Sequence, residues 1–122
     1  MRSIVIALAF AAASGAGLAW PSPAQAQTVI RACAVNNSGL VIRSRFTYSD
    51  WRGTRHQSGW VRSALGQRNC VTLQDVGNLT IEMEQADITG WERLCSRGAD
   101  SGRNATLFVT GTAFNPSCAL EQ

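Results

Sequence analysis

Several short segments of this chain alternate strictly between apolar and polar residues, a pattern that restricts them to extended strands. From Leu79 to Glu84 the odd positions are apolar and the even positions polar. A repeat of two places one set of side chains on a buried face and the other in water. A second segment, from 40 to 48, carries the same repeat in Leu40, Ile42, Phe46 and Tyr48.

Further strands are predicted where β-branched and apolar residues lie between Gly, Asn, Asp and Ser clusters. The expected ranges are Val29–Val35, Gly59–Leu65, Cys70–Leu73 and Thr106–Ala113. From Ala86 to Leu94 the pattern fits no strand, and we expect an irregular segment or a single helical turn capped by Asp87. Short strands with turns about every ten residues indicate an all-β fold, a small antiparallel β-sandwich.

The first 26 residues have the order of a secretory signal peptide. Arg2 precedes an apolar run, Ile4 to Ala13, and Ala24-Gln25-Ala26 places small residues where signal peptidase cleaves. The run is too short to span a bilayer, which takes about 20 residues, although an uncleaved N-terminal anchor is the competing interpretation. We therefore expect residues 27–122 to form a single β domain, periplasmic or secreted, without a stable membrane span after cleavage.

Four cysteines, Cys33, Cys70, Cys95 and Cys118, lie in this domain. An even number of cysteines in a small exported chain predicts disulfides. Three pairings are possible, and pairing neighbours in sequence favours Cys33–Cys70 with Cys95–Cys118. Because no two cysteines are spaced CxxC and the chain has a single histidine, we expect no metal site. No cofactor motif occurs either, so no cofactor is expected.

The charge balance argues against nucleic acid as a partner. All basic residues are arginines, and the 11 in the chain become ten once Arg2 is removed, against eight acidic residues. A net charge near +2 is too small for binding by bulk electrostatics.

The segment from Ser49 to Trp60 carries the strongest functional signal. It joins two expected strands and contains two tryptophans, two arginines and the histidine. Tryptophan and arginine are enriched at binding hot spots. Trp60 is expected in the core. The candidate contact residues are Trp51, Arg52, Arg55 and His56, and the expected partner is a protein or a glycan.

A catalytic interpretation of His56 is the main alternative. A secreted nuclease-like enzyme or toxin would need a second titrating group beside this histidine, supplied by Asp50, Glu82 or Glu84. An inhibitor of a secreted hydrolase is a third possibility and would use the same exposed loop. We expect a non-enzymatic binding or assembly module, with no catalytic residue assigned.

From Cys33 to Leu73 the chain resembles DUF1036, a family of small exported bacterial proteins of unknown function. The resemblance lies in Cys33 followed by Asn36 or Asn37, Ser38 and Val41, and in the residues Tyr48, Asp50, Ser58-Gly59-Trp60, Gly66 and Cys70. It implies a β-rich exported domain and no catalytic residue.

Overall fold

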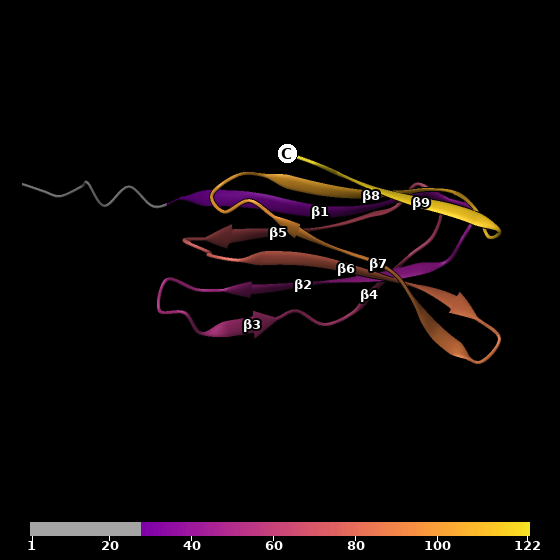
Figure 1. Cartoon of the computed structure of the whole chain (residues 1–122), viewed down its shortest axis with the longest axis horizontal. Helices are drawn as coiled ribbons and strands as arrows, with labels where there is room; N and C mark the ends of the chain where they lie inside the picture. Colours follow the sequence, from indigo (N-terminus) through magenta and orange to yellow (C-terminus); the bar gives the residue numbers. More distant parts are fainter. Residues whose placement is uncertain (1–27) are drawn as a thin grey trace, which may run out of the picture.

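The computed structural model describes residues 28–122, which form two packed β-sheets with no helix (Figure 1). The signal-peptide prediction for residues 1–26 lies outside the described residues. Strands in the described part are β1 (Val29–Ser38), β2 (Ile42–Ser49), β3 (Arg55–Gln57), β4 (Val61–Ser63), β5 (Arg68–Gln74), β6 (Leu79–Asp87), β7 (Gly90–Ala99), β8 (Ala105–Thr112) and β9 (Asn115–Glu121).

One sheet has the strand order β5-β1-β8-β9, and the other has the order β3-β2-β6-β7 with β4 also paired to β2. The chain passes from one sheet to the other after β1, β4, β5 and β7. Neighbouring strands are antiparallel except β1 and β8, which run parallel. The predicted all-β sandwich is confirmed, with this parallel pair as its one departure from antiparallel order in the described residues.

The core lies between the sheets, where the two-residue repeat places the apolar side chains. On β2 the positions that share the parity of Ile42 and Phe46 face inward, and on β6 Leu79, Ile81 and Met83 are buried. Leu107 and Val109 of β8 fill the opposite side. Burying each of these side chains contributes roughly 1.5–3 kcal/mol.

The prediction for Ala86–Leu94 was wrong. This segment is a β-hairpin, in which β6 continues to Asp87 and β7 begins at Gly90. The pairing register shifts between Met83 and Glu84, so that β7 carries one extra residue at Leu94. A bulge of this kind breaks the two-residue repeat, which hid the strand from pattern reasoning. Strands β3 and β9 were not predicted either, and the strand expected from Gly59 to Leu65 is limited to Val61–Ser63.

Both disulfides have the pairing favoured by the sequence. Cys33 and Cys70 face each other on the adjacent strands β1 and β5. Cys95 of β7 and Cys118 of β9 connect the two sheets. Because stable disulfides belong to oxidising compartments, they fit a protein that functions outside the cytoplasm.

Candidate functional site

The predicted contact residues lie on the hairpin that joins β2 to β3, at the end of the molecule nearest residue 28 (Figure 1). Trp51, Arg52, Arg55 and His56 are all exposed, and Trp51 is the most notable, with 73% of its surface in water. The sequence predicted that these side chains point outward, and their exposure agrees with that expectation.

Asp50 organises this hairpin, which we call the Trp51 loop (residues 50–56). Its Oδ1 accepts hydrogen bonds from the backbone N–H groups of Arg52 (2.8 Å) and Thr54 (3.0 Å). Its Oδ2 lies 2.9 Å from His56 Nε2. The hydrogen bond from His56, assisted by the two backbone donors, holds the pKa of the Asp50 carboxyl below its usual value. Gly53 closes the turn at φ 83°, a conformation that favours glycine. The loop is therefore ordered despite its exposure.

Asp50 is the second titrating group that a catalytic His56 would need, and it forms a pair with His56 that is open to solvent. The His56 ring stacks on Tyr48 with centroids 5.3 Å apart, and both side chains of the His56–Asp50 pair are solvent-accessible. The other two carboxylates considered from the sequence are engaged elsewhere, because Glu82 pairs with Arg45 and Glu84 with Arg43. The Asp50–His56 pair thus orders a loop.

Trp60 is not a core residue, contrary to the sequence prediction. It is half-buried on the outer face of the β2–β6 sheet, where two guanidiniums lie over its ring. Arginines and tryptophans follow one another in contact across this face, in the order Arg45, Trp60, Arg43, Trp91 and Arg62. We call these five residues the Trp–Arg ladder.

Contacts in the Trp–Arg ladder are between 4.4 and 5.5 Å from guanidinium carbon to ring centre. Sequence reasoning missed the ladder, although one signal was present. Arg43 and Arg45 share the polar parity of β2, and they lie opposite Glu84 and Glu82 on β6. Most of the polar groups of the Trp–Arg ladder therefore already have partners within the molecule, which favours a structural role over ligand binding.

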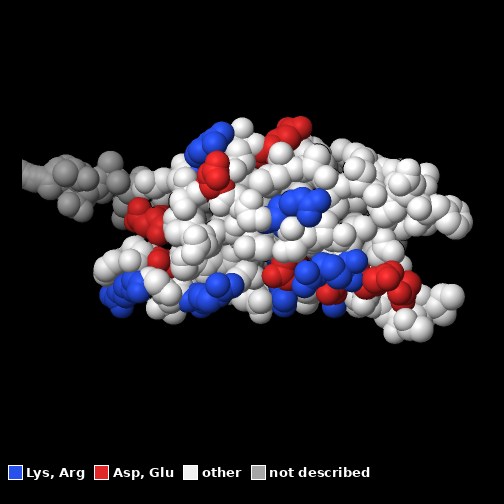
Figure 2. All heavy atoms as spheres, in the orientation of Figure 1, with Lys and Arg blue, Asp and Glu red and all other residues white. Residues whose placement is uncertain are grey.

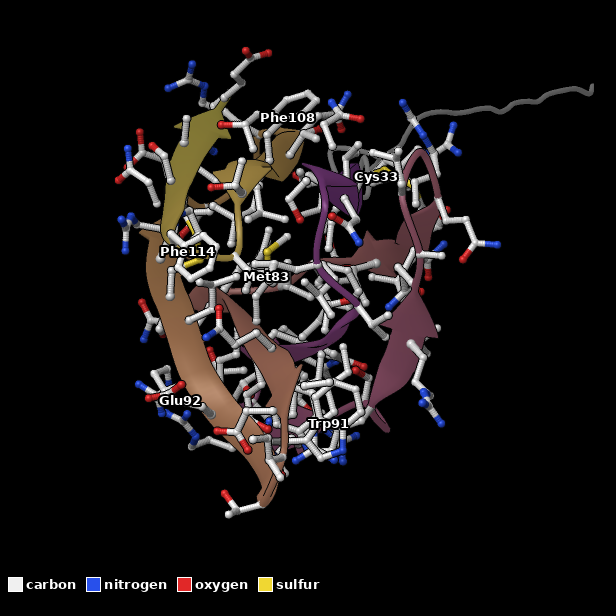
Figure 3. The ribbon with its side chains drawn as sticks, turned by 90° about the vertical axis from the view of Figure 1, so that its right-hand side faces the viewer. Cys33, Met83, Trp91, Glu92, Phe108 and Phe114 are labelled. Carbon is white, nitrogen blue, oxygen red and sulfur yellow. A yellow bond between two sulfur atoms is a disulfide. The ribbon has the colours of Figure 1, made fainter. Side chains whose placement is uncertain are left out.

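Two other exposed apolar side chains stand at the end of the molecule opposite the Trp51 loop. Ile88 lies at the turn of the β6–β7 hairpin and is 102% exposed, and Phe114 lies at the turn of the β8–β9 hairpin and is 99% exposed. Both turns project from the same end in Figure 1. Figure 3 looks onto that end, where Phe114 and the tip of the β6–β7 hairpin form separate points.

These hairpin tips, Ile88 and Phe114, are held in place by local contacts. The Asp87 carboxylate accepts hydrogen bonds from Thr89 N (2.8 Å) and Thr89 Oγ1 (3.0 Å). These bonds lower the pKa of Asp87, which therefore stays charged beside Ile88 near neutral pH. Near the other turn, within β8, Gly111 has φ 98°, and a Cβ at this position would collide with the carbonyl oxygen of Asn115. Neither tip was predicted from the sequence, because the strand pairs that form the two hairpins were not expected.

Within residues 28–122, no group of three or more His, Cys, Asp and Glu side chains is placed to hold a metal ion. The same residues contain no helix that is long and apolar enough to cross a membrane.

No protein-family model and no curated protein matches the chain. Solved structures do resemble it. The membrane-binding domain of pneumolysin has a TM-score of 0.57 at 14% identity, and the match covers 77% of this chain and 96% of that domain. A Gram-negative toxin has a TM-score of 0.61 at 14% identity, covering 76% of this chain and 23% of the toxin. A non-hemolytic pneumolysin from Streptococcus pneumoniae matches with a TM-score of 0.56 at 13% identity, over 76% of this chain and 23% of its own length.

The chain therefore spans about a quarter of the toxins that it matches and almost the whole of the separate pneumolysin domain. At these identities the likeness shows a shared fold.

Proposed function

We propose that this chain is an exported, non-enzymatic binding domain that docks onto a lipid surface through the hairpin tips. The observation that carries the proposal is the complete exposure of Ile88 and Phe114 at one end of the molecule. Single exposed apolar side chains are common on soluble domains, but two fully exposed ones on turns that project from the same end can enter an apolar phase together.

A lipid surface fits the arrangement of the hairpin tips better than a protein pocket does. Phe114 and the tip of the β6–β7 hairpin stand at separate points (Figure 3), so a protein partner would need two pockets at a matching distance. Acyl chains are fluid and accept an apolar side chain anywhere on the surface. The outermost atoms at this end belong to uncharged residues (Figure 2), and the charged Asp87 lies next to Ile88, so contact with lipid must be limited to the tips.

The expected affinity is low. Burying two large apolar side chains yields roughly 1.5–3 kcal/mol each before the cost of association is subtracted. A single chain should therefore bind reversibly, as proteins with one weak membrane signal do. The fold likeness to a domain described as membrane-binding supports a lipid surface as the first partner to test.

Co-sedimentation with phosphatidylcholine vesicles in excess tests the proposal. The oxidised wild-type chain should sediment with the vesicles, and the Ile88→Ser/Phe114→Ser variant should remain in the supernatant. Trp51→Ala is the matched control, because it removes an exposed apolar side chain from the other end and should leave sedimentation unchanged. Wild-type protein that does not sediment, or a tip variant that sediments equally well, would overturn the proposal.

A further inference from the structure

We infer that the Trp51 loop is a separate binding site, for a carboxylate-bearing glycan. It lies at the opposite end of the molecule from the hairpin tips (Figure 1), so it does not depend on the lipid proposal. Two arginines without a carboxylate partner in the described part of the chain, the exposed Trp51 indole and the ordered backbone of the loop support this site.

Two arginines without a carboxylate partner lie beside an exposed tryptophan in this loop; Arg31, Arg62, Arg68, Arg93 and Arg97 also lack such a partner within residues 28–122, so it is the combination with Trp51 that sets the loop apart. Arg43, Arg45 and Arg103 each pair with a carboxylate within the molecule. Within residues 28–122, neither Arg52 nor Arg55 has a carboxylate within 4.0 Å. The carboxylate of the loop itself, Asp50, is occupied by His56 and two backbone N–H groups. The two guanidiniums are thus available for an external anion.

Trp51 and Arg52 together form a platform that is apolar in one part and cationic in the other. The Arg52 guanidinium lies over the Trp51 ring, with its carbon 4.6 Å from the ring centre. A guanidinium stacked on an aromatic ring keeps the N–H groups at its edge free for paired hydrogen bonds to a carboxylate. A hexuronate offers the complement, since its pyranose ring has an apolar C–H face and carries a carboxylate on the ring.

The same features favour a glycan over an acidic peptide. A peptide would gain most by extending the sheet at its edge, but β3 is three residues long, which is too short to pair with a strand of ordinary length. Recognition must therefore come from side chains on a projecting loop. Because Asp50 and Gly53 already order the loop, binding costs little conformational entropy.

Direct titration with uronate oligomers tests this inference. Oligogalacturonate, oligoalginate and hyaluronan fragments are titrated into the wild-type chain, with Trp fluorescence and calorimetry as readouts. At least one should bind, more weakly as salt is raised, because the contact is charged and exposed. Methyl-esterified oligogalacturonate is the matched ligand control for galacturonate, since it keeps the ring and removes the charge, and should bind poorly.

Two substitutions locate the site. Trp51→Ala should weaken binding about 30-fold, as expected for a hot spot, with a melting temperature close to that of wild type. Arg103→Ala is the control, because it removes an exposed, paired arginine from another loop and should leave affinity unchanged. The Ile88→Ser/Phe114→Ser variant should bind the glycan normally, so that failure of the lipid proposal leaves this inference standing.

Three results would overturn the inference: no binding of any of the three uronates, unchanged affinity in Trp51→Ala, or poly-glutamate binding as tightly as the best uronate. The last result would show that the loop recognises acidic peptides.

Discussion

Cys95 on β7 and Cys118 on β9 join the two sheets of the sandwich, with their Cα atoms 6.6 Å apart. These strands are the returning arms of the hairpins that carry Ile88 and Phe114. The bridge therefore fixes the position of one hairpin tip relative to the other. Cys33–Cys70 differs in kind, because it links neighbouring strands that are already hydrogen-bonded.

Removing the Cys95–Cys118 bridge should lower the free energy of unfolding by roughly 3–4 kcal/mol, the amount expected from the chain entropy of a loop of this length. The change is the pair Cys95→Ser and Cys118→Ser, measured by chemical denaturation. Amide exchange in β7 and β9 should also become faster. A parallel variant without Cys33–Cys70 should be destabilised similarly but keep slow exchange in β9. Equal stability of the bridged and unbridged chains would contradict this account.

Trp60 of the Trp–Arg ladder should contribute more to the free energy of unfolding than Trp51 of the Trp51 loop does. Trp60→Ala removes two cation–π contacts and a half-buried indole, and should cost about 2 kcal/mol in the free energy of unfolding. Trp51→Ala is the comparison, since it also removes a tryptophan that contacts an arginine, and should cost less than about 1 kcal/mol. Denaturant titration of both variants checks this. Equal losses would mean that the ladder adds nothing beyond an ordinary surface contact.

Asn36 is a buried polar residue whose replacement should be severe. It is 0% exposed, its Nδ2 donates to the carbonyl oxygens of Leu40 and Ser63, and its Oδ1 accepts from Ser38. Asn36→Ala would leave these buried groups without partners, at a cost of about 3 kcal/mol. Asn37→Ala is the control, because the neighbouring asparagine is exposed and should tolerate the change. Thermal melts of the two variants measure the difference.

The sequence was informative where a strand has one wet face and one buried face. The alternation from Leu79 to Glu84 predicted β6 correctly, and it placed Ile81 and Met83 in the core. It failed where a hairpin contains a bulge, as at Leu94, because one extra residue inverts the parity of everything beyond it. It could not place Trp60, since a large aromatic residue beside a strand can pack inward or lie on arginines of the outer face.

The exposed residues also differ in whether their exposure could be predicted from the sequence. The exposure of Trp51 could be predicted because Asp50 and Gly53 are turn residues. Their preference for turns is a local property that can be recognised in the sequence. The exposure of Ile88 and Phe114 depends on which strands pair, a relation between distant segments. Asn36 and Ser38 are buried and hydrogen-bonded to each other, which gives them a structural role.

Acidification should loosen the Trp51 loop through Asp50. The pKa of this carboxyl is lowered from 3.8, first by its hydrogen bond to His56 and then by backbone donors, so the folded loop favours the ionised form. A depressed pKa stabilises the fold above the unfolded value of about 3.8, and this contribution is lost as the pH falls through the folded value. Carboxyl ¹³C chemical shifts of Asp50 measure its pKa directly, and Trp51 fluorescence should change over the same interval below about pH 3.8.

Two variants identify the cause of this pH dependence. His56→Ala removes the largest contribution, so the pKa of Asp50 should rise toward 3.8. Asp50→Asn keeps an acceptor for the backbone N–H groups but cannot titrate, so the fluorescence of Trp51 should no longer change over this interval. Asp87 serves as the internal reference, because its pKa is lowered by Thr89 at the other end of the molecule and should be the same in the His56→Ala protein. An Asp50 pKa that is unchanged by His56→Ala would show that the backbone donors alone hold the loop, and that His56 packs on Tyr48 without ordering it.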